Sequence, residues 1–310
     1  MGINYIGLSA KDVLRNGVRR LGAKLSGTKR LLSSRGLTEG TLAALRDSQP
    51  PFEPELTGFD NVVSQRSIAA ARCVTFTPRW VEIKKHVIYF PGGLVRQPTK
   101  EQLLFADDVA AKARCPVTLL AYPLAPSYSY ADAYECAARL YAELAASLGA
   151  ENVLLMGDAG GGSVALAICG YFARAGLPKP GGVIAVSPVC DMSLGTELPE
   201  DGDPILSAPG LRAILKSWCG FRFPTDGTVN PMTAEADAIP DTLLLCSDRE
   251  LLFPDICRFA AREGLRQRTK LYAYRGLLHG FAFDDRLDAA KDARDKIVGT
   301  IRNEGLRQNE

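Results

Sequence analysis

From about residue 72 onward, short hydrophobic runs alternate with longer amphipathic stretches. Most of the short runs are apolar at every position, which is typical of parallel strands covered by helices on both faces. Strands are predicted at 73–77, 86–90, 117–121, 153–157, 183–187, 243–247 and 271–274. Helices are predicted near 100–113, 131–148, 161–175, 207–219, 254–266 and 285–303. This alternation predicts a doubly wound, mostly parallel α/β sheet.

Two segments depart from the alternation and suggest how the chain is organised. Residues 191–230 are rich in Gly, Pro and Asp and hold one predicted helix, so we expect an inserted cap element over the strand ends. The Pro-rich stretch 49–54 breaks any helix and is interpreted as a connector. We therefore predict an N-terminal basic cap segment with its connector over 1–55 and a main domain over 56–310.

The N-terminal segment has the pattern of a basic amphipathic helix. Its first fifty residues hold nine basic and three acidic side chains, although the whole chain has a net charge of only +2. Apolar residues recur there at helical spacing, namely Val13, Leu14, Val18, Leu21 and Leu25. We expect this stripe to pack on the main domain, as apolar stripes of helices usually do. The alternatives are a mobile cap or a patch that contacts anionic lipid.

Composition excludes several classes of protein. Of the 310 residues, 46% are hydrophobic and 23% charged, which argues against a disordered chain, and the near-neutral charge gives no reason to expect nucleic acid. Eight cysteines form no CxxC pair, so buried free thiols in a reducing cytoplasm are expected. We see no signal peptide and no run long enough to span a membrane. With two histidines, a multi-histidine metal site is excluded.

The strongest signal for chemistry lies at residues 154–166, where an apolar strand runs into a glycine-rich turn and then a helix. This is the context of a nucleophile elbow, Gly-x-Ser-x-Gly. Gly157 and Gly161 occupy the outer positions, but the central residue is Ala159, whose methyl group cannot attack a carbonyl. A phosphate-binding turn, whose glycine spacing does not match, and an ordinary strand–helix connection are the alternatives. Ser163 lies one turn into the helix and should face away.

A histidine and two carboxylates stand where the partners of a nucleophile would be expected. His279 follows the last predicted strand between flanking glycines, in the chain order nucleophile, acid, base. Asp248 and Glu250 follow the strand before it, and a carboxylate there can accept a hydrogen bond from the imidazole and fix its tautomer. His86 begins a buried strand and is interpreted as structural.

Six short motifs, in the family's order, resemble the α/β-hydrolase esterases of the hormone-sensitive-lipase type. Residues 157–162 resemble Gly-Asp-Ser-Ala-Gly-Gly, and 87–94 resemble the strand and His-Gly-Gly-Gly oxyanion segment. Residues 121–126, 187–191, 239–250 and 279–281 resemble Tyr-Arg-Leu-Ala-Pro, Ser-Pro-x-x-Asp, the Pro-Pro-x-Leu strand before the acid, and His-Gly-Phe. The resemblance spans roughly residues 80–285 and implies an α/β-hydrolase fold with a helical cap.

The resemblance also implies roles for particular residues. The nucleophile position falls on Ala159, the acid on Glu250 rather than Asp248, and the base on His279. The implied oxyanion hole consists of the backbone N–H groups of Gly92, Gly93 and Gly160. Such a site implies a small-molecule ester of short to medium acyl chain as substrate, and it requires no cofactor or metal. A homodimer is common among similar esterases.

The chain departs from the family's pattern at three positions. Pro91 replaces the histidine of the oxyanion segment and Leu94 replaces its third glycine, although the backbone N–H groups of Gly92, Gly93 and Leu94 are still present to donate. The larger departure is Ala159, for which there are two explanations. One is an esterase whose serine was replaced, by design, to silence the enzyme or trap a substrate. The other is a natural pseudoenzyme that uses the pocket as a binding or receptor module. We favour the first because His279, Glu250 and the glycines are retained.

Overall fold

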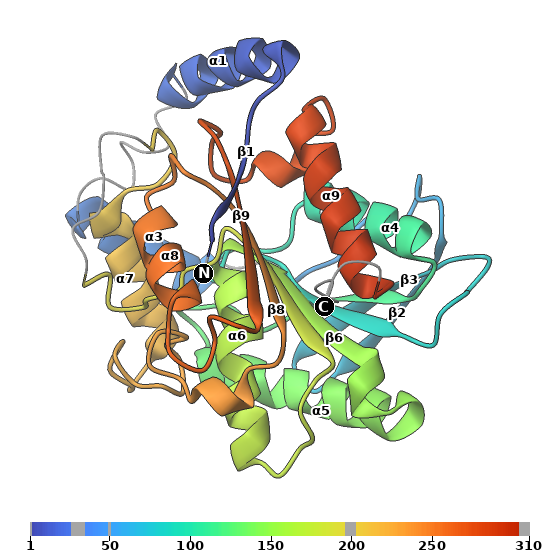
Figure 1. Ribbon diagram of the computed structural model, residues 1–310. Coiled ribbons are helices and arrows are strands. Elements are labelled where there is room, and N and C mark those ends of the chain that lie inside the picture. Colours follow the sequence, from blue (N-terminus) through green and yellow to red (C-terminus); the bar gives the residue numbers. More distant parts are fainter. Residues whose placement is uncertain (1, 26–34, 49–50, 196–202, 304–310) are drawn as a thin grey trace.

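The computed structural model describes residues 2–25, 35–48, 51–195 and 203–303. Nine strands form one twisted sheet in the order β1-β9-β8-β7-β6-β4-β5-β3-β2 (Figure 1). They are β1 Asn4–Ile6, β2 Val62–Ile68, β3 Ala71–Thr77, β4 His86–Phe90, β5 Val117–Ala121, β6 Val153–Asp158, β7 Gly182–Val186, β8 Thr242–Ser247 and β9 Thr269–Tyr274. β3 runs antiparallel to both of its neighbours, and every other pair is parallel. The predicted doubly wound, mostly parallel sheet is confirmed.

Helices cover both faces of the sheet. α4 (Lys100–Ala113) and α9 (Asp288–Ile301) share one buried cluster with the strands. α5 (Tyr130–Leu148), α6 (Ala159–Arg174), α7 (Ala208–Cys219) and α8 (Phe253–Ala260) share the other. Short 3-10 helices lie at Ala150–Asn152, Ala236–Ala238 and Phe281–Phe283.

The two cores follow from the alternation of side chains along each strand. In β4, Val87 and Tyr89 belong to the cluster under α4 and α9, whereas Ile88 and Phe90 belong to the cluster under α5 and α6. Because successive side chains of a strand point to opposite faces, a strand buried on both faces must be apolar throughout. The uninterrupted hydrophobic runs of the sequence are therefore the central strands of the sheet.

Every predicted strand and helix from residue 73 onward is present; β4, β5 and α4 have the predicted ends, and the other elements are shifted at one or both ends. The largest shift is in α8, which ends at Ala260, whereas the sequence pattern continued to 266. Two strands were missed. β2 is a largely exposed edge strand with polar residues along its length, and β1 has three residues, too few to show a pattern. All eight cysteines are free, and all are buried except Cys257, which is partly exposed.

The N-terminal segment is more closely tied to the sheet than its composition suggested. β1 pairs with β9, so the segment predicted as a cap and connector over 1–55 supplies a strand to the main sheet. α3 (Arg35–Ser48) packs against α7, the helix of the predicted cap insertion. Within the described ranges, no helix combines the length and hydrophobicity that crossing a bilayer requires.

The expected packing of the first helix is wrong. In α1 (Ala10–Leu25), the apolar side chains of Val13, Leu14 and Val18 are exposed, and the polar side chains of Asp12 and Asn16 are buried against the domain. The physical reason is that the main domain offers hydrogen-bond partners to the polar side of this helix, at the start of α9 and at Gly276. The helical spacing was sufficient to predict α1 but not which side faces inward.

Candidate active site

Four loops meet at the carboxyl edge of the sheet and place the candidate residues. They follow β4, β6, β8 and β9, which are parallel to one another and therefore end on the same edge. β4 lies beside β6, although β5 comes between them in the chain, so the direction of winding reverses between β4 and β6. In open α/β sheets, this reversal opens a crevice in which ligands bind.

The turn from β6 into α6 has the strained geometry of an elbow. Ala159 is the first residue of α6 and has φ 45°, a left-handed backbone conformation that residues other than glycine rarely adopt. A Cβ atom at Gly161 would overlap the carbonyl oxygen of Phe90, and one at Gly157 would overlap the backbone of Gly161. These two glycines therefore permit the close approach of strand and helix on which the elbow depends.

Ser163 does not share the position of Ala159. Its side chain is fully buried in α6, and its hydroxyl donates a hydrogen bond to the carbonyl oxygen of Ala159 at 3.3 Å. This agrees with the expectation that it faces away from the direction in which the elbow points its central residue.

His279 and Glu250 form a hydrogen-bonded pair at the ends of β9 and β8. The imidazole Nδ1 lies 3.2 Å from Glu250 Oε2. The other carboxylate oxygen, Oε1, accepts hydrogen bonds from the Ser187 hydroxyl at 2.6 Å and from the backbone N–H of Ser247 at 2.9 Å. Glu250 is fully buried, so these contacts fix its carboxylate toward the ring.

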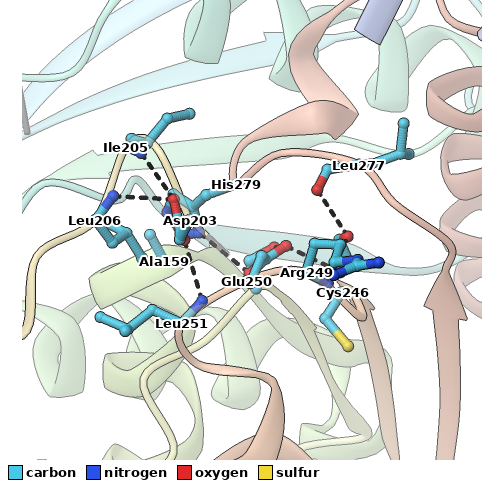
Figure 2. A network of polar contacts seen from close by, with 12 residues as sticks. Ala159, Asp203, Ile205, Leu206, Cys246, Arg249, Glu250, Leu251, Leu277 and His279 are labelled. Atoms are coloured by element: carbon cyan, nitrogen blue, oxygen red, sulfur yellow. Dashed lines mark hydrogen bonds and ion pairs between the residues drawn. The ribbon is translucent and has the colours of Figure 1, made fainter. Parts of the chain in front are cut away.

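Ala159 belongs to the same neighbourhood as this pair. Figure 2 shows Ala159, His279 and Glu250 in the same part of the molecule. The charge of Asp158, the residue before Ala159, acts on the imidazole of His279. The structure therefore brings together the three residues that the sequence resemblance placed in a triad.

The residue pattern left both Asp248 and Glu250 as candidates for the acid, and the structure distinguishes between them. Asp248 Oδ1 accepts a hydrogen bond from the backbone N–H of Gly276 at 2.7 Å. Asp248 thus ties the loop after β9 to the end of β8, whereas Glu250 contacts the imidazole. Gly276 and Gly280 have φ 68° and 73°, so glycine is suited to both bends that flank His279.

Sequence reasoning missed Asp203, which lies beside His279 in Figure 2. Its buried carboxylate accepts hydrogen bonds from the backbone N–H groups of Ile205 and Leu206, and from that of Leu251, next to Glu250. Asp203 thereby fastens the segment of the predicted cap insertion that holds it to the loop after β8. The Asp-Pro pair at 203–204 is a turn signal, but nothing in the sequence indicates that it reaches the site.

The environments of the two histidines move their pKa values in opposite directions. Burial lowers the pKa of His279, but the hydrogen bond and charge of Glu250, with the charges of Asp203 and Asp158, outweigh burial and raise it above its ordinary value. Burial lowers the pKa of His86 to about 4, and its Nε2 lies 2.7 Å from the Thr118 hydroxyl. His86 is thus a structural side chain, as expected.

An NMR titration of the imidazole protons tests this contrast in the unmodified chain, which holds two histidines. One resonance should titrate near pH 4 and the other above the ordinary pKa of histidine. Replacing Glu250 by Gln removes the charge that favours the imidazolium, so the higher pKa should fall while the lower stays unchanged. Two coincident titrations, or a variant with no shift, would contradict the pairing.

The structure corrects one predicted oxyanion donor. The backbone N–H of Gly92 donates to Asp158 Oδ1 at 2.8 Å, so it is not free to bind a developing oxyanion. Asp158 is buried and also accepts hydrogen bonds from the Tyr89 hydroxyl and the Gln102 amide. Gly92 thus anchors its loop to the elbow, a role that its position in a motif does not reveal.

The remaining predicted donors lie where the loop after β4 meets the start of α6. Gly93 has φ 118°, a conformation that favours glycine. A Cβ atom at Gly160 would lie 2.5 Å from the side chain of Leu94, so these two residues are in close contact. Within the described ranges, no protein group accepts a hydrogen bond from the loop N–H groups of Gly93 and Leu94.

The α/β-hydrolase class is defined by a mostly parallel sheet, a left-handed elbow residue, and a histidine–carboxylate pair that follows the last two strands. The chain has all three features. The chain belongs to the alpha/beta hydrolase fold family, whose model matches residues 87–283.

Two curated proteins are similar in sequence to the chain. An esterase from Acinetobacter venetianus is 29% identical over 173 residues, covering 53% of this chain and 57% of that protein. A triacylglycerol lipase from Mycobacterium tuberculosis is 25% identical over 199 residues, covering 64% of this chain and 41% of that protein. The chain therefore spans about half the length of the curated relatives it matches.

Solved structures share the fold over nearly the whole chain. EstE5, in crystals soaked with ethyl alcohol, gives a TM-score of 0.80 at 19% identity and covers 96% of this chain and 99% of its own. EstE7, a hormone-sensitive-lipase homologue from a metagenome library, gives 0.76 at 21% identity and covers 93% and 98%. At these identities the likeness shows the fold alone.

Proposed function

We propose that the site is that of a carboxylic ester hydrolase whose nucleophile position holds Ala159. The observation that carries this proposal is the left-handed backbone of Ala159 next to the His279–Glu250 pair. Such a conformation costs on the order of 1–3 kcal/mol in a residue other than glycine, and strain of this kind gathers at functional sites. A turn that served folding alone would be better formed by glycine.

With a serine at position 159, each neighbouring group has a chemical role. The hydroxyl attacks the ester carbonyl, and His279 takes its proton and later delivers it to the leaving alcohol. Glu250 orients the ring and supports the imidazolium. The N–H groups of Gly93, Leu94 and Gly160 receive the oxyanion, each worth about 3 kcal/mol. Gly92 is left out of this set because its N–H binds Asp158.

The chain with Ala159 lacks the nucleophile, so it binds esters without forming an acyl-enzyme. The substrate class that we propose is a short- to medium-chain acyl ester of a small alcohol. The names esterase and triacylglycerol lipase of two relatives support ester chemistry. The mechanism calls for no cofactor or metal.

A second candidate function is a ligand-binding or receptor module on the same fold. It is favoured by the combination of Ala159 with Leu94, whose side chain contacts Gly160 at the proposed oxyanion hole. The buried His279–Glu250 pair favours the hydrolase, because a binding module gains nothing evident from an oriented base.

An acyl-chain series of p-nitrophenyl esters, from acetate to palmitate, tests the proposed substrate class in the Ala159→Ser variant. We expect the highest kcat/KM at short to medium chains and a steep fall beyond them. In parallel, the unmodified chain should bind the preferred ester and release it uncleaved. A preference for palmitate would overturn the substrate class, and tight ester binding with an inactive variant would favour the receptor module.

A further inference from the structure

α1 is held to the body of the protein through its polar side. The Asp12 carboxylate accepts hydrogen bonds from the backbone N–H groups of Asp288 and Ala289, at 2.8 and 3.0 Å. These are the first two residues of α9, so Asp12 satisfies free donors at the start of a helix 276 positions away. Lys11 adds an ion pair with the Asp288 carboxylate at 2.8 Å.

The same side of α1 makes two further contacts. The Asn16 amide donates to the backbone carbonyl of Gly276 at 2.6 Å. The Arg19 guanidinium lies 3.4 Å from the Asp284 carboxylate. All of these partners belong to α9 or to the loops before it, so α1 is docked at one defined place by specific polar contacts.

This docking leaves the apolar side of α1 facing outward. Val13, Leu14 and Val18 are 59%, 73% and 67% exposed, which is the reverse of an ordinary amphipathic helix on a globular domain. At about 100° per residue, Arg15 borders this apolar face on one side and Arg20 on the other. In all, α1 carries five basic residues and one acidic residue.

We propose that the outward face of α1 is a docking surface for an anionic phospholipid bilayer. An exposed apolar stripe bordered by basic residues is the pattern of helices that lie in the plane of a membrane interface. The basic borders select a negatively charged surface rather than a neutral one. The polar contacts on the opposite side hold the domain to the helix, so that the helix anchors the whole molecule.

The position of α1 relates this surface to the candidate active site. α1 follows β1, which is parallel to β9, and therefore lies at the same edge of the sheet as His279 (Figure 1). Asn16 binds Gly276, which precedes His279 by three residues in the same loop. Membrane docking through α1 therefore brings the site's edge of the sheet toward the interface.

Vesicle flotation of the full chain tests the proposal without any measurement of catalysis. The unmodified protein should float with vesicles that contain about 30% phosphatidylserine and remain unbound with pure phosphatidylcholine. Replacing Val13, Leu14 and Val18 by Ser should lower the partition coefficient about tenfold or more. A Leu14→Trp variant should show a blue shift of its fluorescence with the anionic vesicles and none with the neutral ones.

A matched control removes other exposed apolar side chains. Phe221 and Phe223, which follow α7, are also highly exposed, and their joint replacement by Ser should leave flotation unchanged. All variants should keep the unmodified chain's thermal unfolding midpoint, since the replaced side chains are exposed. Equal recovery on neutral and anionic vesicles, no binding to either, or full binding by the triple variant would overturn the proposal. So would sedimentation showing that the triple replacement converts a dimer into a monomer, because the face would then bind a second copy.

Discussion

The Ala159→Ser variant is expected to hydrolyse short p-nitrophenyl esters about 10⁶-fold faster than the unmodified chain. The magnitude is that of removing the nucleophile from a serine protease, taken in reverse. The elbow already holds residue 159 in its strained conformation, and the pair that would activate a hydroxyl is in place. The measurement is the initial rate of p-nitrophenolate release by each protein under identical conditions.

The control for this gain is a double variant, Ala159→Ser with His279→Ala. It should be as inactive as the unmodified chain, because an isolated serine hydroxyl is a weak nucleophile at neutral pH. Retained activity in the double variant would mean that another base is used. An inactive single variant across all acyl lengths would remove the hydrolase and leave the binding module.

Replacing Glu250 by Gln in the Ala159→Ser background is expected to lower kcat by about 10⁴-fold. The amide keeps the shape of the carboxylate but no longer holds the imidazole in the required tautomer, and it cannot support the imidazolium. The pH profile should shift as well. His279 must be neutral to act as base, so activity rises with pH through its raised pKa, and losing the Glu250 charge should move that rise to lower pH.

Asp248→Asn in the same background is the matched control, because it makes the same loss of charge two residues away. Asp248 contacts the backbone of Gly276 rather than the imidazole, so we expect a far smaller loss of kcat and no comparable shift of the pH profile. If the two substitutions changed rate and pH profile alike, the assignment of the acid to Glu250 would be wrong.

Patterns along the sequence predicted the parts of the fold that are dictated locally. Strands buried on both faces must be largely apolar, so β4 through β8 were visible as short hydrophobic runs, and β9 was visible through its run at 271–274. The elbow was visible because Gly157 and Gly161 are required wherever strand and helix backbones approach closely. The polar edge strand β2 and the three-residue β1 carry no such constraint, since neither is apolar on both faces.

The features of the site and of the α1 contact that the sequence did not reveal depend on contacts between distant segments. The Gly92 N–H is bound by a carboxylate 66 residues away, and Ser187 reaches Glu250 over 63 residues. The helical spacing of apolar residues predicted that α1 is amphipathic. We expected its apolar side to face the core, and that expectation was wrong. The side that docks was decided by Asp12, which finds unsatisfied N–H groups at the start of α9.

The most direct test of the central claim, that residue 159 occupies the nucleophile position beside His279, is covalent labelling followed by mass spectrometry. Diethyl p-nitrophenyl phosphate reacts with an activated serine, which gains a diethylphosphoryl group as p-nitrophenolate leaves. We predict one such group on the Ala159→Ser variant, mapped to the introduced serine, and none on the unmodified chain. Labelling at Ser163, equal labelling of both proteins, or no labelling of the variant would contradict the account.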